Sequence, residues 1–155
     1  MKITVMGTPA PQGSKRHVGN GVMIESSKKV KPWRQDVKYA ALESNDDGTG
    51  CPISGPVNIR VTFYLPRPKS HYGTGRNSGQ IRTTAPSKPA GKPDIDKLLR
   101  STLDALTEAG VFVDDAQITD VLMGKRFADT RPPGAVIDVI AERRLDLTAG
   151  IEAAS

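Results

Sequence analysis

Alternating hydrophobic and polar residues predict four β-strands in this chain. The clearest is 57–63, in which apolar side chains at every second position alternate with Asn, Arg and Thr. Segments 1–6, 118–127 and 135–140 show the same two-residue period over shorter or less regular stretches. A fifth, short strand is predicted at 22–24, because the Gly-Asn-Gly turn before it is typical of a hairpin.

Two helices are predicted from hydrophobic residues at helical spacing. Pro32 suits a first helical turn, and Trp33, Val37 and Ala41 then recur on one face until the turn at 45–48. The second helix, 97–109, places its apolar residues on one side and its charged residues on the other, and Gly110 suits its C-terminus. This order of elements predicts an α+β domain with a mixed or antiparallel sheet and helices packed on one face.

The length of the chain and its loops indicate one domain, 1–145, followed by a C-terminal tail, 146–155. The segment 66–93 has no strand or helix pattern, and it carries six Lys or Arg residues and no acid. We interpret it as a flexible basic loop that lies over DNA and is ordered on binding. The alternative is a solvated linker whose charge only keeps it soluble.

Pairs of aspartates stand on both sides of the second helix. Asp94 and Asp96 precede it, where Asp96 suits the N-cap, and Asp114 and Asp115 follow it. If the second pair folds back against the helix start, three or four carboxylates meet, and such a cluster survives only if it is protonated, paired with basic residues or bound to a hard cation. Aspartate oxygens suit Mg²⁺, with Mn²⁺ as the alternative, and a phosphodiester is a natural substrate for either ion.

A purely structural interpretation explains only part of this pattern. Asp96 would cap the helix and Arg100 would pair with Asp104 one turn later, each adding tenths to about one kcal/mol. That interpretation gives no reason for Asp94, Asp114 or Asp115. An EF-hand calcium loop is excluded, because Leu98 and Ala105 stand where it needs oxygen ligands.

The motif Pro93-Asp94-x-Asp96-x-x-x-Arg100-x-x-x-Asp104-x-Leu106, followed by Gly110 and Asp114-Asp115-x-Gln117, resembles the RusA family of Holliday junction resolvases. A weaker match lies in the N-terminal segment 7–16. The resemblance implies a metal-dependent endodeoxyribonuclease that cuts four-way DNA junctions by paired symmetric nicks in recombination and repair. It also implies a homodimer, because two strands are cut, and a phage or prophage origin.

The resemblance assigns roles to individual residues. Asp94, Asp96 and Asp115 match the family's catalytic acids and would bind Mg²⁺, with Asp114 as a fourth carboxylate. Arg100 stands where the family usually has a catalytic Lys, and Lys97 where it usually has Asn. Because an arginine is effectively never deprotonated, Arg100 can stabilise a charged phosphate but cannot readily donate a proton.

The net charge of +5 fits a nucleic-acid partner. The cations expected to contact DNA are Lys15, Arg16, Arg67, Lys69, Arg76, Arg82, Lys88, Lys92, Lys97 and Lys125. The chain has a single cysteine, Cys51, which excludes an internal disulfide and fits a reducing compartment. No apolar run is long enough to span a membrane. We therefore expect a cytoplasmic protein. Two alternatives remain: a non-catalytic DNA-binding protein and a less selective branched-DNA nuclease.

Overall fold

A computed structural model of the protein describes residues 1–13, 15–17, 19–21, 23–25, 28–45 and 50–142. The strands are β1 (Lys2–Met6), β2 (Lys15–His17), β3 (Met23–Glu25), β4 (Val57–Leu65), β5 (Ile118–Phe127) and β6 (Gly134–Ala141). The helices are α1 (Val30–Asn45) and α2 (Ile95–Glu108), with short 3₁₀ turns η1 (Lys69–His71), η2 (Gly75–Asn77) and η3 (Asp115–Gln117). Every predicted strand and helix that falls on these residues is present.

Four strands form one mixed sheet in the order β1-β6-β4-β5. β6 pairs antiparallel with both β1 and β4, whereas β4 and β5 are parallel. The parallel pair follows from the connection, because a chain that passes through α2 crosses over the sheet before it returns. The prediction of an α+β domain with a mixed or antiparallel sheet is therefore confirmed, and the sheet is mixed.

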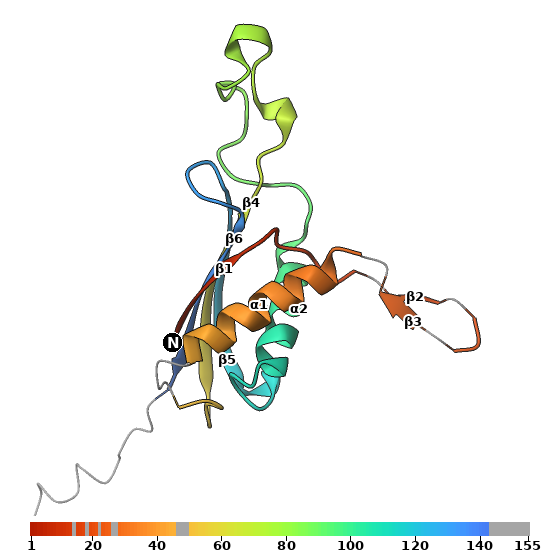
Figure 1. The fold of residues 1–155 in the computed structure, drawn as a ribbon, viewed down its shortest axis with the longest axis vertical. Coiled ribbons are helices and arrows are strands. Elements are labelled where there is room, and N and C mark those ends of the chain that lie inside the picture. The colour runs from red at the N-terminus through yellow and green to blue at the C-terminus, as the bar shows by residue number, and fades with distance from the viewer. Residues whose placement is uncertain (14, 18, 22, 26–27, 46–49, 143–155) are drawn as a thin grey trace, which may run out of the picture.

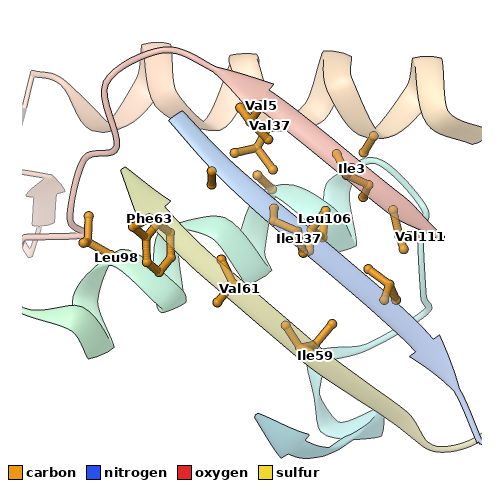
Figure 2. Packing of buried hydrophobic residues seen from close by; sticks show 14 of the residues in the cluster. Ile3, Val5, Val37, Ile59, Val61, Phe63, Leu98, Leu106, Val111 and Ile137 are labelled. Carbon is orange, nitrogen blue, oxygen red and sulfur yellow. The ribbon is translucent and has the colours of Figure 1, made fainter. Parts of the chain in front are cut away.

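Both helices pack on one face of this sheet (Figure 1). Alternate residues of β4 point into the core, and Phe63 and Leu98 lie beside each other there, as Figure 2 shows. Trp33 is 1% exposed, and its indole N–H donates to the hydroxyl of Thr102 at 3.1 Å. That bond satisfies the polar atoms of both side chains, which are buried between the helices.

α2 begins two residues earlier than the sequence pattern predicted. Asp94, and not Asp96, occupies the N-cap position, and the Asp94 side chain makes no capping hydrogen bond. Asp96 lies inside the first turn, where its charge interacts favourably with the helix dipole. Gly110 ends the helix with a φ of 74°, a conformation that costs glycine least, as predicted.

The predicted hairpin is also present, as β2 paired antiparallel with β3. Lys15 and Arg16, expected to contact DNA, lie in the β2 strand of this hairpin, which projects from the body of the domain (Figure 1). Residues 46–48 of the predicted turn and the tail after residue 142 lie outside the described residues.

The basic segment 66–93 projects beyond the end of the sheet between β4 and α2 (Figure 1). It contains the two 3₁₀ turns η1 and η2, and a β-bridge joins Tyr72 to Ile81. Backbone hydrogen bonds also tie Gly73 to Gln80 and Arg82 to His71. The segment thus has internal structure of its own; its flexibility in the free protein stays a prediction.

Candidate functional site

The start of α2 presents two exposed carboxylates to solvent. Asp94 and Asp96 are both exposed, and the Lys97 ammonium lies 3.5 Å from Asp94 with both side chains about half exposed. The Leu98 amide donates to the Asp94 carbonyl at 3.1 Å, which is the first hydrogen bond of the helix. The geometry leaves the carboxylate oxygens of both aspartates accessible to a cation.

Lys125 fixes this helix start against the end of the sheet. Its Nζ donates to the carbonyls of Gly91 at 2.8 Å and Pro93 at 2.9 Å, directly before Asp94. Lys125 was predicted to contact DNA. Its ammonium is bonded to these two carbonyls and so helps to position the segment that carries Asp94 and Asp96, while a DNA contact by Lys125 stays a prediction.

Arg67 holds the base of the basic loop. Its Nε and Nη2 donate to the two carboxylate oxygens of Asp129, each at 2.8 Å, and its Nη1 donates to the Pro86 carbonyl at 2.9 Å. The guanidinium also stacks over the Phe127 ring, 3.9 Å from its centroid. The hydrogen bonds from Arg67 keep the pKa of Asp129 below its usual value.

The Arg67 side chain is only 5% exposed, and its charge is paired within the protein. A DNA contact by Arg67 stays a prediction. In contrast, Lys69, Arg76, Lys88 and Lys92 are exposed, and so is Arg82, whose Nε donates to the Tyr72 carbonyl at 2.7 Å.

A pocket of about 660 Å³ lies between this loop and the start of α2. Its walls are mostly apolar, formed by prolines of the loop, by Leu65 and Phe127 at the strand ends, and by Ala10. Asp94, Lys97, Lys92, Lys29 and His71 also line it. The pocket thus joins an apolar wall to a carboxylate and several cations.

The second aspartate pair lies at the opposite end of β5. Asp114 caps η3, since its carboxylate accepts from the Ala116 amide at 2.8 Å. The Gln117 side chain donates to the carbonyls of Ile53 and Gly55, just before β4. These bonds hold the 114–117 turn beside the beginning of the parallel strands.

Lys125 places Asp94 near the end of β5, whereas Asp115 immediately precedes its beginning. A ten-residue strand is about 30 Å long at roughly 3.3 Å per residue. The condition that the turn folds back against the start of the same helix is not met within one chain, because α2 and β5 run in opposite directions. Among the residues that the structure describes, no group of three His, Cys, Asp or Glu side chains could hold a metal ion.

Asp104 was expected to pair with Arg100 and instead lies 3.9 Å from Arg34 of α1. Arg34 also donates to Glu108, so it joins the two helices across their polar flanks. Arg100 remains exposed, and no ion pair involving it occurs in the described part of the chain. Its guanidinium is therefore available to a phosphate beside Asp96, one helical turn away.

Comparison with known proteins agrees with the resemblance seen in the motif. The family model described as Endodeoxyribonuclease RusA matches residues 6–140. The chain belongs to the RusA endodeoxyribonuclease family. The chain is also similar to the "Uncharacterized protein YqaN" of Bacillus subtilis (strain 168). The two sequences are 30% identical over 131 residues, which cover 83% of this chain and 89% of that protein.

The RusA match includes both aspartate pairs, Arg100 and the whole basic loop. The roles of these residues in catalysis, metal binding and DNA binding stay predictions.

The Arg67–Asp129 pair and the Arg34 contacts were not predicted from the sequence, because their partners lie more than sixty positions apart and follow no local period. None of the described helices is long and apolar enough to cross a membrane.

Proposed function

We propose that this RusA-family protein is an endodeoxyribonuclease that resolves four-way DNA junctions by paired symmetric nicks, in recombination and repair. Family membership over residues 6–140 supports the nuclease class. The observation that carries the proposal is the exposed Asp94–Asp96 pair at the start of α2, next to a pocket lined by Lys92 and Lys97.

Mg²⁺, or Mn²⁺ in its place, is the ion we expect at the carboxylates, with Asp94, Asp96, Asp115 and Asp114 as ligands. Such an ion neutralises charge at a phosphodiester and activates water. Among the described residues of one chain, no three of these carboxylates come together, so a single chain does not supply the full set. Arg100, exposed on the same helix, would stabilise negative charge on the phosphate that is cut.

The DNA-binding surface we propose runs along the exposed cations of the loop and onto α2. Lys69, Arg76, Arg82 and Lys88 line the projecting segment, and Lys92 and Lys97 lead to the aspartates. Lys15 and Arg16 stay in the proposal as contacts made from the β2–β3 hairpin. Two such surfaces on a homodimer would hold two strands of the junction, and the protein would work in the cytoplasm, that of a bacterial host if phage-encoded.

The alternative is a non-catalytic junction-binding protein, and one observation favours it. The acids of one chain are separated, so a chain acting alone has an incomplete ligand set. A less selective branched-DNA nuclease is the second alternative, because no described feature fits a four-way junction and excludes other branched DNA.

The test is a cleavage assay with end-labelled four-way junction, linear duplex and single strand, in Mg²⁺ and in EDTA. We expect nicks at symmetric positions of the junction alone, and none in EDTA. Cutting of all three substrates would support the less selective nuclease. Tight junction binding without cutting in Mg²⁺ or Mn²⁺ would contradict the nuclease and support the binding protein.

A further inference from the structure

The pocket between the basic loop and the start of α2 has no part in the metal chemistry proposed above. Its volume of about 660 Å³ lies within the range of about 300–1,000 Å³ that is typical of sites for small organic ligands. Two segments far apart in the sequence form its walls, 8–13 before the hairpin and 86–93 before α2. Asp94 belongs to its lining, so a group held in the pocket lies beside the proposed cleavage site.

Hydrogen bonds hold the wall formed by segment 8–13 against α2. The Gln12 amide donates to the Lys97 carbonyl at 3.1 Å. The Ser101 hydroxyl, which is buried, donates to the Ala10 carbonyl at 2.7 Å. This wall is therefore fastened to the helix that carries the proposed metal ligands.

The wall formed by the loop is fastened to the sheet. Lys125 of β5 donates to the carbonyls of Gly91 and Pro93. Arg67, just after β4, donates to the Pro86 carbonyl. Both walls are thus held in place within the protein, so the pocket is formed before any ligand binds and little freedom is lost on binding.

The lining of the pocket combines buried apolar groups with exposed cations. The residues of the lining that are buried are all apolar: Pro9, Ala10, Leu65 and Pro89. The cations of the lining are exposed: Lys29, Lys92 and Lys97. A nucleotide suits such a lining, because the faces of its base are apolar and its phosphate pairs with ammonium groups.

His71 adds a directed polar group to this lining. Its Nδ1 lies 3.4 Å from Nη1 of Arg67, and because an arginine only donates, Nδ1 is the acceptor and the neutral ring carries its proton on Nε2. The ring meets Phe127 edge-on, with 5.5 Å between the centroids, which fixes its plane. An N–H group in this position can donate to the ring nitrogens and carbonyl oxygens at the edge of a nucleobase.

We propose that this pocket takes up one unstacked nucleobase of the DNA substrate, from a nucleotide beside the phosphate that is cut. The base lies between the apolar walls, and the neighbouring phosphates pair with Lys29, Lys92 and Lys97. Because a base leaves its stack most easily where it is mismatched or unpaired, the pocket favours branched DNA over a continuous duplex. This inference rests on the proposed nuclease function and names the part of the DNA that the site holds.

The fluorescence of 2-aminopurine tests the uptake of a base without cutting DNA. The probe is a four-way junction with 2-aminopurine at one position near the branch point, moved through successive positions and bound to the wild type in EDTA. Since 2-aminopurine brightens when it leaves the base stack, its fluorescence should rise several-fold at one position of a strand and stay unchanged at the neighbouring positions. A junction that stays unbound, or that binds without brightening at any position, would overturn the proposal.

Narrowing the pocket should abolish this signal. Thr8 and Ala90 lie on its two walls and are both exposed, so Thr8→Leu/Ala90→Leu narrows the pocket without changing the core. Thr4→Leu/Ala141→Leu makes the same changes at exposed positions of β1 and β6 and is the matched control. The pocket variant should lose the brightening, and the control should keep it. Brightening by the pocket variant at the wild-type level would overturn the proposal.

A mismatch at the brightened position tests the energetic consequence by gel shift in EDTA. The wild type should bind the mismatched junction about tenfold more tightly than the paired junction, because the cost of unpairing the base is reduced. The pocket variant should bind both equally. No preference in the wild type, or the same preference in the pocket variant, would overturn the proposal. If the wild type cuts no junction, the nuclease proposal fails and these assays still decide the base site. If it cuts but no position brightens, only the base site fails.

Discussion

Asp96 is the residue on which the proposed chemistry depends most. It is exposed in the first turn of α2, so replacing it should change charge without disturbing the fold. We expect Asp96→Asn to lower junction cleavage by more than about 100-fold, since even residues that only orient a metal ligand contribute 10- to 100-fold. Junction binding should persist or tighten, because one charge that repels phosphate is lost.

Paired cleavage and gel-shift assays would measure both effects. Glu43→Gln, on the exposed surface of α1, is the matched control and should leave both unchanged. Cleavage by Asp96→Asn at the wild-type rate would remove Asp96 from the site.

The pKa of Asp129 gives a second prediction for single residues. The Arg67 hydrogen bonds hold this pKa below its usual value in the folded protein. The charged Asp129 therefore stabilises the folded state fully at pH values above the unfolded pKa of about 3.9. It is lost as the pH falls through the lower folded value. Asp129→Asn should therefore be less stable than the wild type at pH 7 and at pH 5, and the difference should shrink below about pH 4.

Urea unfolding at pH 7, 5 and 3 would measure this difference. An equal deficit at all three values would mean that the Asp129 charge contributes nothing. Because Arg67 also binds Pro86, proteolysis of the 66–93 loop should accelerate in Asp129→Asn at neutral pH.

The contact between α1 and α2 depends on a buried polar bond. Thr102 accepts from the Trp33 indole, and both residues are 1% exposed. Thr102→Val keeps the volume and removes the acceptor, which should lower the free energy of unfolding by about 1–3 kcal/mol. Thr107→Val is the matched control, since its hydroxyl only bonds back to Leu103 within the helix, and it should cost less. Equal costs in urea unfolding would contradict this account.

The elements themselves were largely predictable, because they follow local periods. The alternation in 57–63 and 118–127 gave strands close to β4 and β5, and the apolar stripe of 97–109 gave α2. The start of α2 was missed by two residues, since either Asp94 or Asp96 suits a cap. The internal turns of 66–93 were missed because they rest on pairings such as Gly73 with Gln80, which leave no periodic signal.

The site was harder to predict than the elements, because it depends on their directions. The sequence identified both aspartate pairs, and the family match contains them. That Asp115 lies far from Asp94 follows from the parallel pairing of β4 with β5 and the opposite direction of α2, which are properties of the whole sheet. Likewise, only the tertiary structure shows that Arg67 and Lys125 are engaged within the protein.

At the scale of the molecule, the exposed cations of the loop should set the salt dependence of DNA binding. Arg76 and Lys88 are exposed, so each would neutralise one phosphate. Arg76→Gln and Lys88→Gln should each reduce the slope of log affinity against log salt concentration by about 0.9. Lys38→Gln on α1 should leave the slope unchanged. Fluorescence anisotropy with a labelled junction at several salt concentrations would measure the slope. Unchanged slopes for the loop variants would mean that DNA does not bind along the 66–93 loop.

The most direct test of the central claim is cleavage of a supercoiled plasmid that extrudes a cruciform. A dimer with two working sites should nick opposite strands of the four-way junction in one encounter, so Mg²⁺ should convert the plasmid to a linear product. A plasmid without the inverted repeat should stay supercoiled. Open circles as the only product, equal cutting of both plasmids, or no cutting would contradict a junction resolvase.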